Sequence, residues 1–77
     1  MNQNYLEIDF EKVKGYKKLS ENAKGVFQKV YRAHNSMQGQ THKFDWVPIS
    51  VKECKTHLEV RFHGGEWLRY LPNGTWY

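Results

Sequence analysis

Two glycine turn signals near the end of this 77-residue chain constrain its fold more than any other feature. Gly64-Gly65 separates the stretch THLEVRF from WLRYL, and Asn73-Gly74 separates WLRYL from TWY. THLEVRF alternates apolar and polar residues, which is the period of a strand with one buried face. Gly-Gly and Asn-Gly pairs favour tight hairpin turns because they tolerate positive φ angles. This end of the chain is therefore predicted to form an antiparallel meander.

The stretch KFDWVPISVKEC, which precedes these strands, is predicted to be a further extended segment. Pro48 has no N–H to donate to a neighbouring strand, so it favours an edge position or a bulge. With this segment the sheet has three or four strands.

One long helix is predicted before the sheet, in LSENAKGVFQKVYRAHNSMQG. Ser20 is a suitable N-cap, and Gly39 is a suitable C-terminal stop. His34, near the C-terminal end, is expected to cap the helix or to offset its dipole. A short extended entry and a turn of helix should come before it. Apolar residues recur at the helical steps of three and four: Leu19, Ala23, Val26, Phe27, Val30, Tyr31 and Met37.

These patterns predict a single compact α+β domain over residues 1–77. One main amphipathic helix precedes a three- to four-stranded antiparallel β-meander and packs on it. At this length the chain has room for one hydrophobic core. Its twelve aromatic residues should form most of that core, since each aromatic side chain buries roughly 150–250 Å².

The register of the Gly-Gly hairpin decides which face of the sheet carries Trp67. A two-residue loop pairs Phe62 with Trp67 and places Trp67 on the core face together with Arg69. A three-residue loop over residues 64–66 pairs Phe62 with Leu68 and moves Trp67 to the opposite face, because a shift of one residue exchanges the two faces. The second register avoids burying a guanidinium group, which costs several kcal/mol. Both registers remain open.

At the second hairpin, a two-residue turn of Asn73-Gly74 is expected to pair Leu71 with Trp76 and Tyr70 with Tyr77. Combined with the three-residue loop, this pairing exposes an apolar and basic patch of the kind found at binding surfaces. The patch consists of Arg61, His63, Trp67, Arg69, Leu71 and Trp76.

The patch favours a small non-enzymatic binding protein that modulates or inhibits a partner protein, because Trp, Tyr and Arg are the residues most often found at interface hot spots. Such a protein fits a regulatory or mobile-element accessory role. The short TWY strand at the edge of the sheet would also allow a homodimer to form edge to edge.

Nucleic-acid binding is the alternative function for the same Trp/Arg/Lys surface. Twelve Lys and Arg against eight Asp and Glu give a net charge of +4 at neutral pH, which attracts anionic partners. Aromatic rings beside basic side chains supply stacking and phosphate contacts together. The basic residues outside the sheet that could contact phosphates are Lys12, Lys14, Lys17, Lys18, Lys24 and Arg32.

The sequence shows no strong catalytic or metal-binding pattern. Cys54 and His57 have a short spacing, but His63 lies about 20 Å from His57 along an extended strand, so these three residues are not expected to share an ion. Cys54 has no evident oriented base that would make it a nucleophile. We therefore expect no catalytic residue, no metal and no cofactor, and a protein that is not an enzyme.

The stretch GEWLRYLPNGTWY resembles one aromatic and glycine hairpin of the choline-binding repeats. Repeats of that family bind choline between adjacent copies. The resemblance covers thirteen residues and a single copy, so it implies no choline site.

The expected location is the cytoplasm, with no membrane partner. The single cysteine, Cys54, cannot form an internal disulfide, whereas small extracellular domains usually carry several. No apolar run approaches the ~18 residues of a membrane span.

Overall fold

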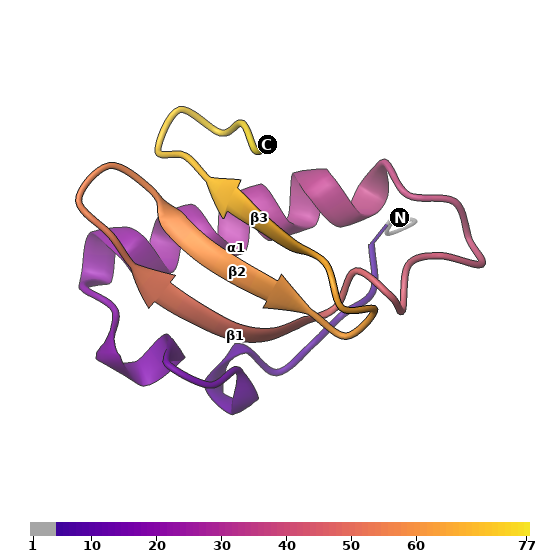
Figure 1. The fold of residues 1–77 in the computed structure, drawn as a ribbon, viewed down its shortest axis with the longest axis horizontal. Helices are drawn as coiled ribbons and strands as arrows, with labels where there is room; N and C mark the ends of the chain where they lie inside the picture. Colours follow the sequence, from indigo (N-terminus) through magenta and orange to yellow (C-terminus); the bar gives the residue numbers. More distant parts are fainter. Residues whose placement is uncertain (1–4) are drawn as a thin grey trace.

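The computed structural model describes residues 5–77 (Figure 1). One α-helix, α1 (Glu21–Ser36), packs on a three-stranded antiparallel sheet of β1 (Pro48–Glu53), β2 (Leu58–Phe62) and β3 (Trp67–Tyr70), in the order β1-β2-β3 (Figure 1). The predicted α+β class and the order of helix before sheet are confirmed, and the sheet has three strands. Within the described part of the chain, no helix is both long enough and apolar enough to cross a membrane.

Two short 3-10 helices, η1 (Phe10–Lys12) and η2 (Tyr16–Lys18), lead into α1. The Asp9 carboxylate accepts a hydrogen bond from the Glu11 N–H at 3.0 Å and caps η1. The predicted turn of helix at the entry to the domain is therefore confirmed, and Asp9 before it is extended.

The N-terminal end of α1 lies where the sequence predicts it, whereas the C-terminal end does not. Ser20 Oγ accepts a hydrogen bond from the Ala23 N–H at 3.1 Å, as expected of an N-cap. The helix ends at Ser36, before the predicted stop at Gly39. Met37 lies just beyond the last helical turn and is 74% exposed, so its predicted place on the buried stripe is wrong.

Aromatic rings dominate the core between α1 and the inner face of the sheet. Phe27 and Tyr31 from α1 meet Phe62 and Tyr70 from β2 and β3, and all four are at most 1% exposed. The Phe27 and Tyr70 ring centroids are 6.0 Å apart, within the usual range for aromatic pairs.

His34 belongs to this core. It is 1% exposed, and its ring centroid lies 5.1 Å from those of both Trp46 and Trp76. Burial lowers the pKa of His34 to about 4, because desolvation disfavours the charged imidazolium. The residue is neutral near pH 7, so its predicted role as a dipole-compensating charge is wrong.

The β2–β3 hairpin has a three-residue loop, but the loop covers residues 63–65. Val60 pairs with Leu68, and the Phe62 N–H donates to the Glu66 carbonyl at 2.9 Å. The predicted pairing of Phe62 with Leu68 is therefore wrong by two residues. A shift of two leaves the faces unchanged, so the side of the sheet away from α1 still carries Arg61, Trp67 and Arg69.

The C-terminal hairpin also has a three-residue loop, over residues 72–74, and this overturns the predicted pairing. Tyr70 pairs with Trp76, and two backbone hydrogen bonds of 2.9 and 3.1 Å join Arg69 to Tyr77. The shift of one residue exchanges the faces of the last two aromatics. Trp76 therefore packs beside the core, and Tyr77 lies on the side of Trp67.

Proline chemistry explains this register. A two-residue turn would pair Pro72 with Thr75, but Pro72 has no N–H to donate across the pair. In the observed loop, the Gly74 N–H donates to the Leu71 carbonyl at 3.0 Å and closes a four-residue turn. Pro72 occupies the second position of this turn. Proline suits that position, and Gly74 adopts the positive φ of 95° that follows it.

The predicted edge position and bulge of β1 are both confirmed. β1 is an outer strand of the sheet, and its register against β2 shifts between Pro48 and Ser50. On the side of β1 away from β2, the backbone of Lys14 forms an isolated β-bridge. Its carbonyl accepts from the Val51 N–H at 2.8 Å, and its N–H donates to the Ile49 carbonyl at 3.1 Å.

Candidate binding face

The side of the sheet away from α1 is covered by no helix or strand of the described residues (Figure 1). We call it the outer face. Strand pairing sets its side chains in two rows across the sheet. One row runs through Lys52, Glu59, Arg69 and Tyr77, and the other through Ser50, Arg61 and Trp67.

Arg69 lies between two aromatic rings on the outer face. Its guanidinium carbon is 4.7 Å from the centroid of the Trp67 ring and 5.1 Å from that of Tyr77. Each such contact is worth roughly 0.5–1 kcal/mol at an exposed site. Trp67 is 44% exposed and Tyr77 is 63% exposed. The three side chains form an ordered aromatic and cationic cluster that remains open to a ligand.

The structure places most of the predicted partner-binding residues together. Arg61, Trp67 and Arg69 lie on the outer face, and half-buried Leu71 follows Arg69 by two residues. His63 is exposed in the β2–β3 loop, and its ring centroid is 4.3 Å from that of Phe44.

Trp76 is the exception among the predicted residues, because it packs beside His34 on the helix side of the sheet. Tyr77 takes its place on the outer face. Sequence reasoning missed Tyr77 because it assumed a two-residue turn. Pro72 was the signal that could have revealed the longer loop.

A shallow basic groove borders the outer face along the edge of β1. Its charged lining consists of four cationic side chains, Lys14, Lys18, Lys52 and Arg61, and one carboxylate, Glu59. The groove joins Lys14 and Lys18, predicted as nucleic-acid contacts, to Arg61 of the sheet.

The other predicted nucleic-acid residues lie outside this groove. Lys12 and Lys17 are exposed. Lys24 Nζ is 3.7 Å from the Glu21 carboxylate and 5.5 Å from the Tyr16 ring centroid. The guanidinium carbon of Arg32 lies 5.6 Å from the Phe10 ring centroid. Lys24 and Arg32 therefore already have intramolecular partners.

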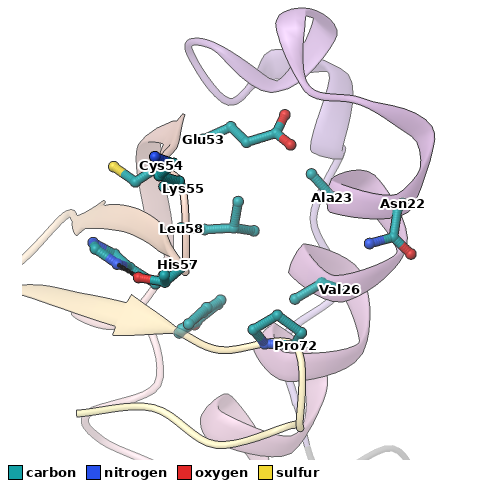
Figure 2. Close-up of a pocket in the computed structure, with 11 residues that line it drawn as sticks. Asn22, Ala23, Val26, Glu53, Cys54, Lys55, His57, Leu58 and Pro72 are labelled. Atoms are coloured by element: carbon teal, nitrogen blue, oxygen red, sulfur yellow. Dashed lines mark hydrogen bonds between the residues drawn. The ribbon is translucent and has the colours of Figure 1, made fainter.

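A small cavity of about 110 Å³ lies between α1 and the β1–β2 turn (Figure 2). Its volume is below the roughly 300–1,000 Å³ of typical small-molecule sites. Ala23, Val26 and Leu58 are among its lining residues. The side chains of Cys54 and His57 point away from it, toward the opposite side of the sheet (Figure 2).

Comparisons with protein-family models, curated proteins and solved structures find no match to this chain. The outer face and the groove beside it are therefore the features that bear on function.

Proposed function

We propose that this chain is a non-enzymatic binding protein that docks on a partner protein through the outer face and thereby modulates or blocks that partner. The cluster of Trp67, Arg69 and Tyr77 is the anchor. The observation that carries this proposal is the position of the Arg69 guanidinium between two exposed rings. An arginine ordered before binding loses less conformational entropy when the complex forms.

The composition of the face supports a protein partner. Trp, Tyr and Arg dominate interface hot spots, since they combine a large apolar surface with polar groups that fix orientation. Two further exposed apolar side chains come from segments beside the sheet: Phe44, whose ring packs on His63, and Ile49 at the bulge of β1, which are 57% and 50% exposed. Apolar surface of this kind is typical of docking sites.

The charge of the face indicates the kind of partner. Lys52, Arg61 and Arg69 carry three positive charges, and Glu59 between them carries one negative charge. The complementary surface is therefore an acidic patch beside an apolar pocket. Charge complementarity of this type raises the association rate and makes it sensitive to salt.

Affinity capture followed by a measurement with purified components tests the proposal. Wild type and a Trp67→Ala, Arg69→Ala, Tyr77→Ala variant serve as baits, and a specific partner is recovered only by wild type. With the purified partner, each single substitution is expected to weaken binding by at least about tenfold. Lys29→Ala, a change on the exposed surface of α1, is the matched control and should bind like wild type. A partner bound equally by the triple variant contradicts the proposal.

The predicted homodimer is part of the same proposal. Residues 75–77 extend the sheet beyond β3 through the hydrogen bonds between Arg69 and Tyr77, and the far edge of this segment would pair with a second copy. Sedimentation at increasing concentration should then show a dimer. A protein that stays monomeric at every concentration contradicts this pairing.

Nucleic-acid binding is the second candidate function, and the basic groove is the observation that favours it. Binding of a single-stranded oligonucleotide should weaken steeply with salt, because each phosphate contact releases a counterion. The Lys14→Ala, Lys18→Ala variant should reduce the slope of log K against log salt by about 2. Binding without salt dependence, or an unchanged slope in this variant, argues against the groove.

A further inference from the structure

Three metal-ligating side chains meet where β1 turns into β2. The Cys54 N–H donates to the His57 carbonyl at 2.9 Å, so these residues face each other across the turn. Glu59, in β2, follows His57 by two residues, and alternation along the extended chain places the two side chains on the same side. The Cys54 sulfur, a His57 ring nitrogen and a Glu59 carboxylate oxygen all lie within 4.8 Å of one another.

His57 supplies a second, independent observation. Its Nε2 atom is buried and, in the part of the chain that the structure describes, has no hydrogen-bond partner. The other ring nitrogen, Nδ1, lies 3.1 Å from Thr56 Oγ1. Metal-binding histidines commonly use one ring nitrogen for the ion while the other is held by a hydrogen bond. The unpaired Nε2 is therefore the atom presented to a ligand.

We propose that Cys54, His57 and Glu59 form a binding site for a divalent transition metal, with Zn²⁺ as the best match. A thiolate, an imidazole and a carboxylate are all common zinc ligands, and the soft sulfur selects against Mg²⁺ and Ca²⁺. Three protein ligands leave the fourth tetrahedral position open to water.

The geometry requires a modest closure. In a tetrahedral zinc site with bonds of about 2.0–2.3 Å, ligand atoms are separated by about 3.3–3.8 Å. The ligand atoms here would have to approach one another by about 1 Å. Cys54, His57 and Glu59 are only half-buried, so rotation of their side chains can supply that movement.

The proposed metal site lies on the outer side of the sheet. Cys54 and His57 point away from the cavity beneath the turn and toward the outer side of the sheet (Figure 2). The sequence predicts no metal site because His57 and His63 are far apart, and in the structure they flank β2 on either side. That prediction does not consider Glu59 as a ligand. The metal site shares Glu59 with the outer face, but it does not rest on the docking proposal, and cobalt titration tests it without any protein partner.

Cobalt titration of the reduced, metal-free chain tests the site. We expect one Co²⁺ per chain, with a sulfur-to-cobalt charge-transfer band and the intense visible absorption of four-coordinate cobalt. Zn²⁺ should abolish both signals at one equivalent, because it binds such sites more tightly than cobalt does. Zn²⁺ should also raise the melting temperature, because an ion bound to the folded state stabilises it.

Variants identify the ligands. Cys54→Ser should remove the charge-transfer band, whereas Glu59→Gln should keep that band with weaker binding. Thr56→Val removes the hydrogen bond to Nδ1 and should weaken binding about 10–100-fold. His57→Asn should weaken it further. His63→Asn, in the β2–β3 loop and outside the cluster, is the matched control and should bind like wild type.

Circular dichroism of each metal-free variant separates loss of a ligand from loss of the fold. Absence of the charge-transfer band in wild type overturns the proposal. So does cobalt binding that survives Cys54→Ser unchanged, or binding that depends on His63 rather than His57.

Discussion

The Nδ1 atom of His34 lies 3.0 Å from the hydroxyl of Tyr70, and this contact joins the last turn of α1 to the end of β3. Both side chains are at most 1% exposed. Burial lowers the pKa of His34 to about 4 and raises the pKa of the Tyr70 hydroxyl. Both groups are therefore neutral at pH 7, and the core holds this hydrogen bond without a buried charge.

The pKa of His34 predicts how stability depends on pH. The folded pKa of about 4 lies below the ordinary value of 6.5 for a histidine, so the unfolded chain binds more protons between these two pH values. Stability is therefore greatest above pH 6.5 and is lost as the pH falls toward 4. The free energy of unfolding from urea titrations should fall by about 2 kcal/mol between pH 7 and pH 5 through this group.

Matched histidine variants assign that pH dependence. His34→Gln should lower stability at pH 7 but remove most of the loss between pH 7 and pH 5. His42→Gln, at an exposed position, should retain the wild-type slope. An equal slope in wild type and His34→Gln contradicts the assignment.

Asn35 is a buried polar residue, and its side chain is expected to stabilise the fold by linking two other segments of the chain to α1. Its Oδ1 accepts from the Leu6 N–H at 2.9 Å, its Nδ2 donates to the Lys43 carbonyl at 3.0 Å, and the residue is 0% exposed. Asn35→Ala removes both bonds and should cost about 2–4 kcal/mol in chemical denaturation. Asn22→Ala, at an exposed position on the same helix, should change stability by no more than about 0.5 kcal/mol. Equal effects would show that Asn35 does not anchor these segments.

Two glycines should respond to alanine in opposite directions. Gly15 has a φ of 90°, and a Cβ atom there would overlap the Val51 carbonyl oxygen of β1. Gly15→Ala should therefore cost at least about 2 kcal/mol, from the left-handed backbone and the displaced strand edge. Gly25 lies within α1, and a Cβ there meets nothing within 4 Å. Gly25→Ala should raise the unfolding free energy by about 0.5–1 kcal/mol. Thermal melts of both variants check the signs, and a stabilising Gly15→Ala contradicts the structure.

The tryptophans should differ in accessibility and in their contribution to stability. Trp67 is 44% exposed, whereas Trp46 and Trp76 pack against the core. Trp67→Phe should reduce acrylamide quenching and shift the remaining emission to the blue, with little change in stability. Trp76→Ala should cost about 2 kcal/mol or more, because it removes packing from His34. Quenching that is unchanged in Trp67→Phe contradicts the assigned face.

The sequence by itself determined the features that depend on local backbone chemistry. The period of three and four predicted α1, and Ser20 marked its start because a hydroxyl satisfies an unpaired N–H there. Alternation predicted β2, and Pro48 marked an edge strand with a bulge. The glycine pairs predicted both hairpins. Each of these signals depends on residues that are close together in the sequence, so it can be recognised without knowledge of tertiary contacts.

Only the tertiary structure decided the features that depend on a one-residue choice or on distant partners. Asn73-Gly74 alone allows turns of two and three residues. Pro72 favours the longer turn, and the observed pairing of Tyr70 with Trp76 shows which aromatic faces outward. His34 became a core residue because Tyr70 and two tryptophan rings surround it. Cys54, His57 and Glu59 meet because the turn closes between them. The surroundings of His34 and the metal-ligand cluster depend on contacts between residues that local propensity does not bring together, so packing of the whole chain decides them.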